Sequence, residues 1–145
     1  MQDEVFSYAS PFGLISYTWN GECCARLWLA DPPPGFPAAD DPVRHWLDAY
    51  FEGEESPLPP LAAPRTPFQQ KMRAGALAIP RGATLSYSEL ATRLGTAPRA
   101  LGQALGANPL PLLIPCHRIV AAHGLGGFAC GLDWKRRLLA FEQQT

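Results

Sequence analysis

A proline-rich run near the middle of the chain limits what this sequence can fold into more than any other feature. It reads Ser56-Pro57-Leu58-Pro59-Pro60-Leu61-Ala62-Ala63-Pro64. Because proline fixes the backbone angle φ and has no amide hydrogen to donate, the run can form neither a helix nor an internal strand. We therefore expect two domains, at 1–55 and 66–145, joined by a linker at 56–65.

The charges of the chain divide at the same place. Residues 1–64 hold two arginines and ten Asp or Glu, whereas residues 65–145 hold ten Lys or Arg and three Asp or Glu, and the net charge is −1. A basic half favours contact with a polyanion such as nucleic acid, while the acidic half stays out of contact. The division is equally compatible with two halves that neutralise each other across their interface.

The remaining composition narrows the class of protein. An apolar fraction of 47% is sufficient for a buried core and excludes disorder. Because no segment resembles a signal peptide and no apolar run could span a bilayer, we expect a cytoplasmic protein with no membrane partner. Adjacent Cys23 and Cys24 would point to opposite faces of a strand, which argues against a disulfide framework or a shared metal site.

The acidic half predicts a small antiparallel sheet with one helix. Strand-like runs lie at 5–8, 14–19 and 22–30. Asn20-Gly21, between the last two runs, suits a two-residue hairpin turn. Asp41-Pro42 supplies a helix cap and first helical residue, and Gly53 ends that helix.

The basic half predicts a series of short helices. Thr66-Pro67 opens the first, and Ser86 and Glu89 have the spacing of a capping box at the start of the next. Gly95 ends that helix, and a further helix at 98–108 completes a pattern typical of a helix-turn-helix, although most helix hairpins are structural. The exposed positions of the helix at 98–108 are expected to be small residues, which allow close approach to another surface. These residues are Gly102, Ala104, Gly106 and Ala107.

The residues best suited to covalent catalysis lie in the heptad Ile114-Pro115-Cys116-His117-Arg118-Ile119-Val120. A thiol becomes a strong nucleophile when a neighbouring base removes its proton, and His117 is such a base. Glu142 is the carboxylate available to orient that base, because Asp133 is expected to cap the last helix. The alternative is that Cys116 is simply a small buried apolar residue.

With these motifs the chain resembles the O6-alkylguanine-DNA alkyltransferases from about Thr66 to Glu142. The motifs occur in the family's order: Arg99-Ala100-Leu101-Gly102, Asn108-Pro109, Pro115-Cys116-His117-Arg118, Gly127-Phe128, Gly131-Leu132 and Leu138-Leu139-Ala140-Phe141-Glu142. The first half matches only through Ser10-Pro11-Phe12-Gly13 and its strand pattern. The resemblance implies an α+β fold, with a ribonuclease H-like sheet domain followed by a winged-helix-like helix-turn-helix domain.

The resemblance also implies a reaction. An alkyl group would move irreversibly from O6 of guanine in DNA to Cys116, so each molecule acts once and needs no cofactor. Glu142 would orient His117, which would remove the thiol proton through a bound water. Tyr87 would hydrogen-bond guanine N3, and Asn108 would brace the helix-turn-helix against the active-site turn.

The implied partner is double-stranded DNA containing O6-alkylguanine, and the protein is expected to act as a monomer. A modified base must leave the duplex to be reached, and the planar guanidinium of Arg99 would replace it in the stack. A helix rich in small residues suits the minor groove, where readout is degenerate. The implied DNA contacts are Tyr87, Arg99, Ala100, Gly102, Gln103 and Ala104. Lysines and arginines that could contact phosphates are Lys71, Arg73, Arg81, Arg93, Lys135, Arg136 and Arg137.

The implied substrate pocket contains departures from the family pattern. Its residues are Ile119, Phe128, Ala129 and Cys130, with the backbone near Cys116, Ile119 and Ala129 expected to hold the guanine edge. Phe128 and Ala129 replace a common tyrosine and serine, and Phe141 stands where a histidine often precedes the glutamate. Cys130 occupies a position that is usually glycine or bulky. The sequence therefore leaves open the alkyl size range, a second reactive thiol, and the choice between O6-alkylguanine and O4-alkylthymine.

Three other functions fit parts of the pattern. Alkyltransferase-like proteins bind lesions without transfer, but they lack the cysteine that Cys116 provides. A hydrolase with a Cys-His pair would regenerate its thiol and turn over, whereas an alkyl thioether cannot be hydrolysed. A regulator that senses methylation would need an additional domain, for which 145 residues leave no room.

Overall fold

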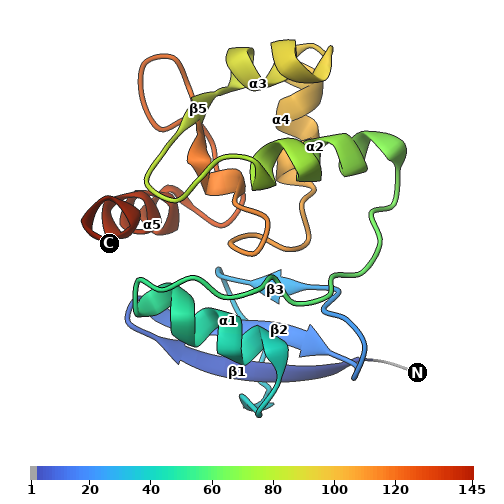
Figure 1. Ribbon diagram of the computed structural model, residues 1–145, viewed down its shortest axis with the longest axis vertical. Coiled ribbons are helices and arrows are strands. Elements are labelled where there is room, and N and C mark those ends of the chain that lie inside the picture. Colours follow the sequence, from blue (N-terminus) through green and yellow to red (C-terminus); the bar gives the residue numbers. More distant parts are fainter. Residues whose placement is uncertain (1–2) are drawn as a thin grey trace. The chain divides into compact units, whose positions relative to one another are not determined.

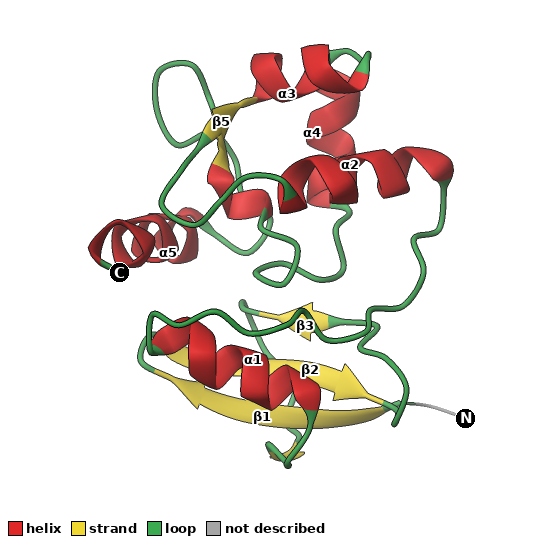
Figure 2. Cartoon of the chain, viewed as in Figure 1, coloured by secondary structure: helices red, strands yellow, loops and turns green. Residues whose placement is uncertain are grey.

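The computed structural model describes residues 3–145, which form two compact units that divide between Ala63 and Pro64. The first contains a sheet and one helix, and the second is mainly helical with a two-stranded sheet (Figures 1 and 2). The α+β class predicted from the sequence is therefore confirmed.

The sheet of the first unit has four strands in the order β3-β2-β1-β4. Their bounds are β1 Glu4–Ser10, β2 Gly13–Trp19, β3 Leu27–Trp28 and β4 Phe36–Pro37. β1 and β2 pair antiparallel along their full lengths, and the turn between them is Pro11-Phe12. β4 pairs with β1 in parallel, so the sheet is not wholly antiparallel.

The predicted antiparallel pairing of the strands on either side of Asn20-Gly21 is confirmed, because β2 and β3 pair antiparallel. The predicted two-residue turn is wrong, because side chains take the amides that a continuous ladder needs and the connection is longer. The side-chain oxygen of Asn20 accepts hydrogen bonds from the amides two and three residues later, both at 2.8 Å. The hydroxyl of Thr18 accepts two further amides at 3.1 Å. The predicted strand at 22–30 is consequently reduced to β3, and Cys24 forms an isolated bridge with Leu61 instead.

Part of the proline-rich segment packs against the first unit. The Cys24 amide donates to the Pro60 carbonyl and the Ala62 amide donates to the Cys24 carbonyl, both at 2.9 Å. Pro59 is buried. The backbone groups that proline leaves available in this segment therefore pair with an irregular stretch of the first unit.

The helix α1, Pro42–Phe51, lies across the sheet (Figure 1). Its N-cap is Asp41, as predicted, and one carboxylate oxygen accepts the Arg44 amide at 2.8 Å. The other oxygen accepts the Tyr17 hydroxyl at 2.7 Å. The Asp41 carboxylate therefore connects the start of α1 to β2. Asp41 and Tyr17 are both buried.

Three helices of the second unit pack against one another: α2 Pro67–Leu77, α3 Tyr87–Leu94 and α4 Pro98–Gly106. The capping box of Ser86 and Glu89 is formed, and Gly95 ends α3 in the left-handed conformation with φ of 69°. The sequence predictions for these helix starts are confirmed, and α3 and α4 form the predicted helix pair. Ala104 is buried, however, so it does not belong to the exposed face of α4.

The remainder of the second unit contains a short parallel sheet and a final helix. β5, Leu85–Ser86, pairs with β6, Ile119–Val120, and α5 covers Leu132–Gln144. The N-cap of α5 is Gly131, so the prediction that Asp133 caps this helix is wrong. Asp133 lies in the first turn and pairs with Arg137 at 3.3 Å.

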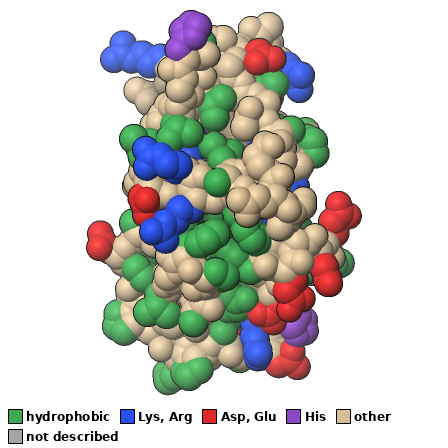
Figure 3. Space-filling model, turned by 90° about the vertical axis from the view of Figure 1, so that its left-hand side faces the viewer, with side chains coloured by type: hydrophobic (Ala, Val, Ile, Leu, Met, Phe, Trp, Pro, Cys, Tyr) green, Lys and Arg blue, Asp and Glu red, His purple; other side chains and the backbone are tan. Residues whose placement is uncertain are grey.

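The charge division is visible on the molecular surface. On the face drawn in Figure 3, most acidic side chains gather on the first unit, and most Lys and Arg side chains lie on the second. No helix in residues 3–145 has both the length and the apolar character that crossing a membrane requires.

We predict that Asp41→Ala lowers the free energy of unfolding of the first unit by about 2–4 kcal/mol, because it removes a helix cap and leaves the buried Tyr17 hydroxyl without an acceptor. Urea unfolding followed by fluorescence in a Trp134→Phe background would measure this in the first unit, which contains the other tryptophans. Asp40→Ala, at the exposed neighbouring position, should change little. A loss below about 1 kcal/mol for Asp41→Ala would contradict the assigned role.

Candidate active site

Cys116 lies at a junction of backbone elements in the second unit. It opens the 3-10 turn η1, Cys116–Arg118, which leads directly into β6. Its side chain is only 7% exposed. The loop before it contains Leu112 with φ of 77°, a left-handed conformation that is unfavourable for a residue other than glycine. A strained turn of this kind needs interactions that hold it in place.

The side-chain amide of Asn108 supplies such interactions. Its Nδ2 donates to the Ile114 carbonyl at 3.2 Å and to Cys116 Sγ at 3.3 Å, and its Oδ1 accepts the Leu110 amide at 3.0 Å. Asn108 follows the end of α4 by two residues. One side chain therefore ties the end of α4 to the turn that holds the thiol.

His117 and Glu142 form a buried pair beside the thiol. His117 Nε2 lies 2.7 Å from Glu142 Oε2, and the two side chains are 0% and 1% exposed. Burial lowers the pKa of His117 more than the neighbouring carboxylate raises it, so the imidazole is neutral. With the hydrogen on Nε2, the other nitrogen is an acceptor, and Nδ1 is buried with no hydrogen-bond partner in residues 3–145.

Glu142 also accepts two hydrogen bonds from Arg118, at 2.8 and 3.0 Å. Burial alone would raise the pKa of this carboxyl, but the hydrogen bonds from His117 and Arg118 outweigh burial and hold it well below its usual range. Glu142 is therefore ionised, although it is almost completely buried.

The last turn of α5, which carries Glu142, is fastened to the loop after α2. Gln143 donates to the Gly82 carbonyl at 2.7 Å, and Arg81 donates to the Thr145 hydroxyl. The Arg81 guanidinium also lies 5.2 Å from the centre of the Phe141 ring. Phe141, which departs from the family pattern, thus has a packing role at this helix end.

Lys135 is a functional candidate whose environment the sequence did not reveal. It was a predicted phosphate contact, but its side chain is 0% exposed, which contradicts that prediction. Its Nζ donates to the Ile119 carbonyl at 2.6 Å and to the Gly127 carbonyl at 2.9 Å, and lies 5.7 Å from the centre of the Tyr87 ring. The sequence signal for burial of Lys135 was its position on α5 three residues before the buried Leu138, whereas Arg136 and Arg137 between them are exposed.

The thiol and this ammonium influence each other. Burial raises the pKa of Cys116 to about 11, although the hydrogen bond from Asn108 and the charge of Lys135 act in the opposite direction. Burial lowers the pKa of Lys135 to about 8, and the charge of a Cys116 thiolate would raise it. The resting site therefore holds a protonated thiol close to a lysine that favours its ionisation.

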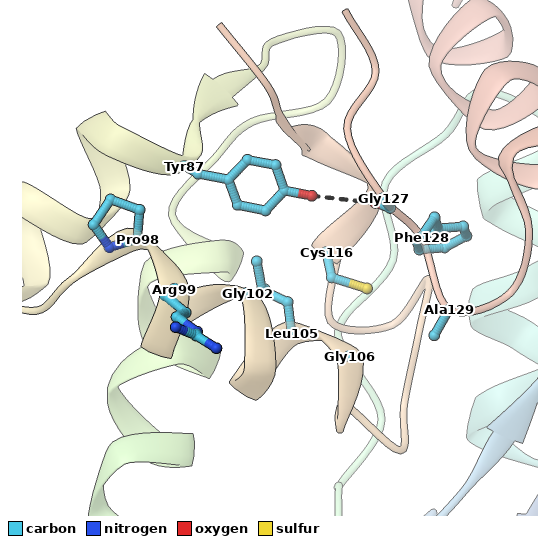
Figure 4. Close-up of a pocket in the computed structure, with 10 residues that line it drawn as sticks. All are labelled: Tyr87, Pro98, Arg99, Gly102, Leu105, Gly106, Cys116, Gly127, Phe128 and Ala129. Carbon is cyan, nitrogen blue, oxygen red and sulfur yellow. Dashed lines mark hydrogen bonds between the residues drawn. The ribbon is translucent and has the colours of Figure 1, made fainter.

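A cavity of about 670 Å³ opens beside Cys116. Its lining residues are Tyr87, Pro98, Arg99, Gly102, Leu105, Gly106, Cys116, Gly127, Phe128 and Ala129. In Figure 4 the Tyr87 hydroxyl points toward Gly127, whose carbonyl accepts its hydrogen bond at 3.2 Å, and Cys116 lies between α4 and the loop that carries Phe128 and Ala129. Burial raises the pKa of Tyr87, so its hydroxyl remains a hydrogen-bond donor.

The structure brings most of the predicted site residues together. Of the predicted DNA and pocket residues, Tyr87, Arg99, Gly102, Phe128 and Ala129 line the cavity. Ala100 and Gln103 lie on α4 outside this lining, with Gln103 exposed. Ile119 and Cys130 are also outside it: Ile119 is 0% exposed, and Cys130 follows Ala129 on the loop with its side chain half-buried.

No group of three or more His, Cys, Asp or Glu side chains in the described part of the chain could hold a metal ion. Fold and site together define a class of α+β proteins in which a helix-turn-helix unit contains a buried cysteine, histidine and glutamate beside an open cavity. The family model described as "6-O-methylguanine DNA methyltransferase, DNA binding domain" matches residues 67–144. The chain belongs to this family.

Relatives and solved structures agree with this assignment. The methylated-DNA--protein-cysteine methyltransferase of Saccharolobus solfataricus is 37% identical over 139 residues, covering 93% of this chain and 92% of that protein. The protein of the same name from Metallosphaera sedula is 40% identical over 146 residues, covering 94% and 90%. The O6-methylguanine methyltransferase structure from Mycobacterium tuberculosis has a TM-score of 0.85 at 33% identity, covering 99% and 94%. A structure of Mycobacterium tuberculosis OGT in complex with DNA has a TM-score of 0.85 at 34% identity, covering 97% and 92%.

We predict that Lys135→Met slows the reaction of Cys116 with iodoacetamide about three- to tenfold below pH 8, because loss of the ammonium raises the pKa of the thiol further. Peptide mapping after timed exposure to the reagent would follow Cys116 separately from the other thiols. The difference should narrow as the pH rises through about 8, where Lys135 itself loses its charge. Arg65→Met removes an exposed cation as a control, and equal rates for wild type and Lys135→Met below pH 8 would contradict the electrostatic role.

Proposed function

We propose that this protein repairs DNA by transferring an alkyl group, such as methyl, from O6 of guanine to Cys116. The observation that carries the proposal is the position of the thiol, which borders an open cavity and lies next to a buried base and carboxylate. Because the product is a stable thioether, each molecule acts once. The names of the relatives, which describe cysteine methyltransferases acting on methylated DNA, support this reaction.

The proton of the thiol must leave before or during the transfer, because the pKa of Cys116 is raised to about 11. Nδ1 of His117 is the available acceptor, reached through a bridging water. Sulfur then attacks the alkyl carbon in line with the C–O6 bond, the S–C bond forms, and the bonding electrons of the C–O6 bond remain with guanine. The guanine anion takes up one proton, which balances the proton lost by the thiol. The charge of Lys135 stabilises the thiolate while this happens.

Tyr87 assists the departure of guanine. Its hydroxyl donates to the Gly127 carbonyl at 3.2 Å, and a guanine in the cavity would offer N3 as an alternative acceptor. A hydrogen bond at N3 stabilises the negative charge that develops on the base. The same ring lies against Lys135 Nζ, so Tyr87 and Lys135 act from one side of the pocket.

We propose that α4 engages the minor groove of duplex DNA, and that the damaged base rotates out into the cavity. Arg99 is exposed in the first turn of α4 and borders the cavity, which supports its role as the side chain that fills the gap in the stack. The N-terminus of α4 has no side-chain cap, so the amides of Arg99 and Ala100 are free to bind a phosphate. Whether O4-alkylthymine is also a substrate depends on how the cavity accommodates the smaller base.

We predict that Cys116→Ala abolishes transfer and preserves DNA binding, because only the acceptor atom is lost. Duplex DNA carrying one O6-methylguanine would be incubated with each protein, followed by intact mass, peptide mapping and a binding titration. Wild type should gain one methyl group on Cys116 and then stop. Cys23→Ala, which removes a thiol of the first unit, should behave as wild type. Transfer by Cys116→Ala would exclude the proposal, and tight binding by wild type without a mass change would favour a non-catalytic lesion-binding protein.

We predict that Gly102→Ala stabilises the folded protein by up to about 1 kcal/mol and weakens DNA binding about tenfold. A Cβ at Gly102 would meet nothing within 4 Å in the protein, so the change costs no packing, but the methyl group would separate α4 from the groove. Thermal unfolding and a binding titration on the same duplex would measure the two effects. Ser88→Ala on α3, which also favours helix, serves as the control for stability without loss of binding. Unchanged binding by Gly102→Ala would contradict the proposed approach of α4.

A further inference from the structure

The transfer reaction described above assigns no role to Arg118, yet all three nitrogens of its guanidinium donate hydrogen bonds. Nε and Nη2 donate to the two oxygens of Glu142 at 2.8 and 3.0 Å, and Nη1 donates to the Ile79 carbonyl at 2.8 Å. The Arg118 side chain is 12% exposed, and the carboxylate it contacts is 1% exposed. A two-pronged pair of this kind fixes both the charge and the orientation of the carboxylate.

A buried carboxylate beside an imidazole and no cation would take up a proton. The proton could reside on His117, which then carries hydrogen on both ring nitrogens. It could instead reside on Glu142, which would then donate to Nε2 and leave the hydrogen of the neutral imidazole on Nδ1. Both arrangements block Nδ1, and a blocked Nδ1 cannot accept the proton of Cys116.

We infer that Arg118 is a positioning residue of the transfer reaction: by neutralising and orienting Glu142, it keeps His117 neutral with its hydrogen on Nε2. The inference rests on the proposed function, because only a reaction that deprotonates Cys116 needs Nδ1 as an acceptor. Nη1 of Arg118 donates to the Ile79 carbonyl, so the position of the guanidinium depends on the loop after α2 as well as on α5.

The other charged and titratable groups around His117 act in the same direction or belong to the reaction. Lys135 on α5 and Arg118 on η1 both disfavour a proton on His117, and Glu142 favours it. Cys116 is the proton donor. Removal of Arg118 therefore takes away one of two cations that keep the imidazole neutral, and it leaves the full charge of Glu142 acting on His117.

The test is the pH dependence of single-turnover methyl transfer from duplex DNA carrying one O6-methylguanine, across about pH 5 to 8. Arg118→Met should slow transfer at least about tenfold at neutral pH, and the rate should recover as the pH rises and the His117–Glu142 pair loses its extra proton. Arg118→Lys, which keeps a charge, should recover most of the loss. DNA affinity should stay unchanged, and Arg44→Met, which breaks the half-exposed pair of Arg44 with Asp48, should keep the wild-type profile.

A uniform loss of rate at every pH would overturn the inference, because a merely structural role for Arg118 gives that result. A wild-type rate and profile for Arg118→Met would overturn it equally.

The protonation state of His117 can also be read directly in the wild-type protein, which keeps the inference testable if Arg118→Met does not fold. Nitrogen chemical shifts of labelled histidines distinguish the two neutral tautomers and the imidazolium, and His45→Gln and His123→Gln would assign the signals. Hydrogen on Nε2 at neutral pH is expected, and hydrogen on Nδ1 would overturn the inference. Failure of wild type to methylate Cys116 would instead refute the proposed function, so the two failures are distinguishable.

Discussion

The side-chain amide of Asn108 is the interaction on which the arrangement of the second unit depends. Asn108 lies two residues after the end of α4, and its side-chain amide donates to both the Ile114 carbonyl and Cys116 Sγ. A loop with a non-glycine residue in the left-handed region would not by itself hold a sulfur atom in place. The surface that is proposed to meet DNA and the atom that is proposed to react are thus parts of one hydrogen-bonded structure.

Burial and the charges of the site leave the thiol of Cys116 protonated at neutral pH, because its pKa is raised to about 11. Glu142 is balanced by Arg118, which leaves His117 neutral, whereas Lys135 Nζ donates to two backbone carbonyls and has no carboxylate partner among the described residues. Deprotonation of Cys116 creates a thiolate whose negative charge interacts favourably with the ammonium of Lys135.

The sequence predicted the features that depend on a few adjacent residues. Helix starts at Asp41-Pro42, at Thr66-Pro67 and at Ser86 were confirmed because a cap needs only its own turn. The two-residue turn at Asn20-Gly21 did not form because the Thr18 hydroxyl accepts the Ala25 and Arg26 amides and a distant proline-rich segment accepts the Cys24 amide. The burial of Lys135 could not be predicted, since it depends on two carbonyls contributed by other parts of the fold. The motif around Cys116 gave the composition of the site, but the bidentate contact of Arg118 required the structure.

Glu142 lies in the last turn of α5, and helix ends are the places where helices open first. The contacts of Gln143 with Gly82 and of Arg81 with Phe141 and Thr145 hold that turn closed. Partial opening there would release the carboxylate while the cores of both units remained folded. The position of Glu142 beside His117 therefore depends on the contacts of one helical turn with the loop after α2, as well as on the packing of the core.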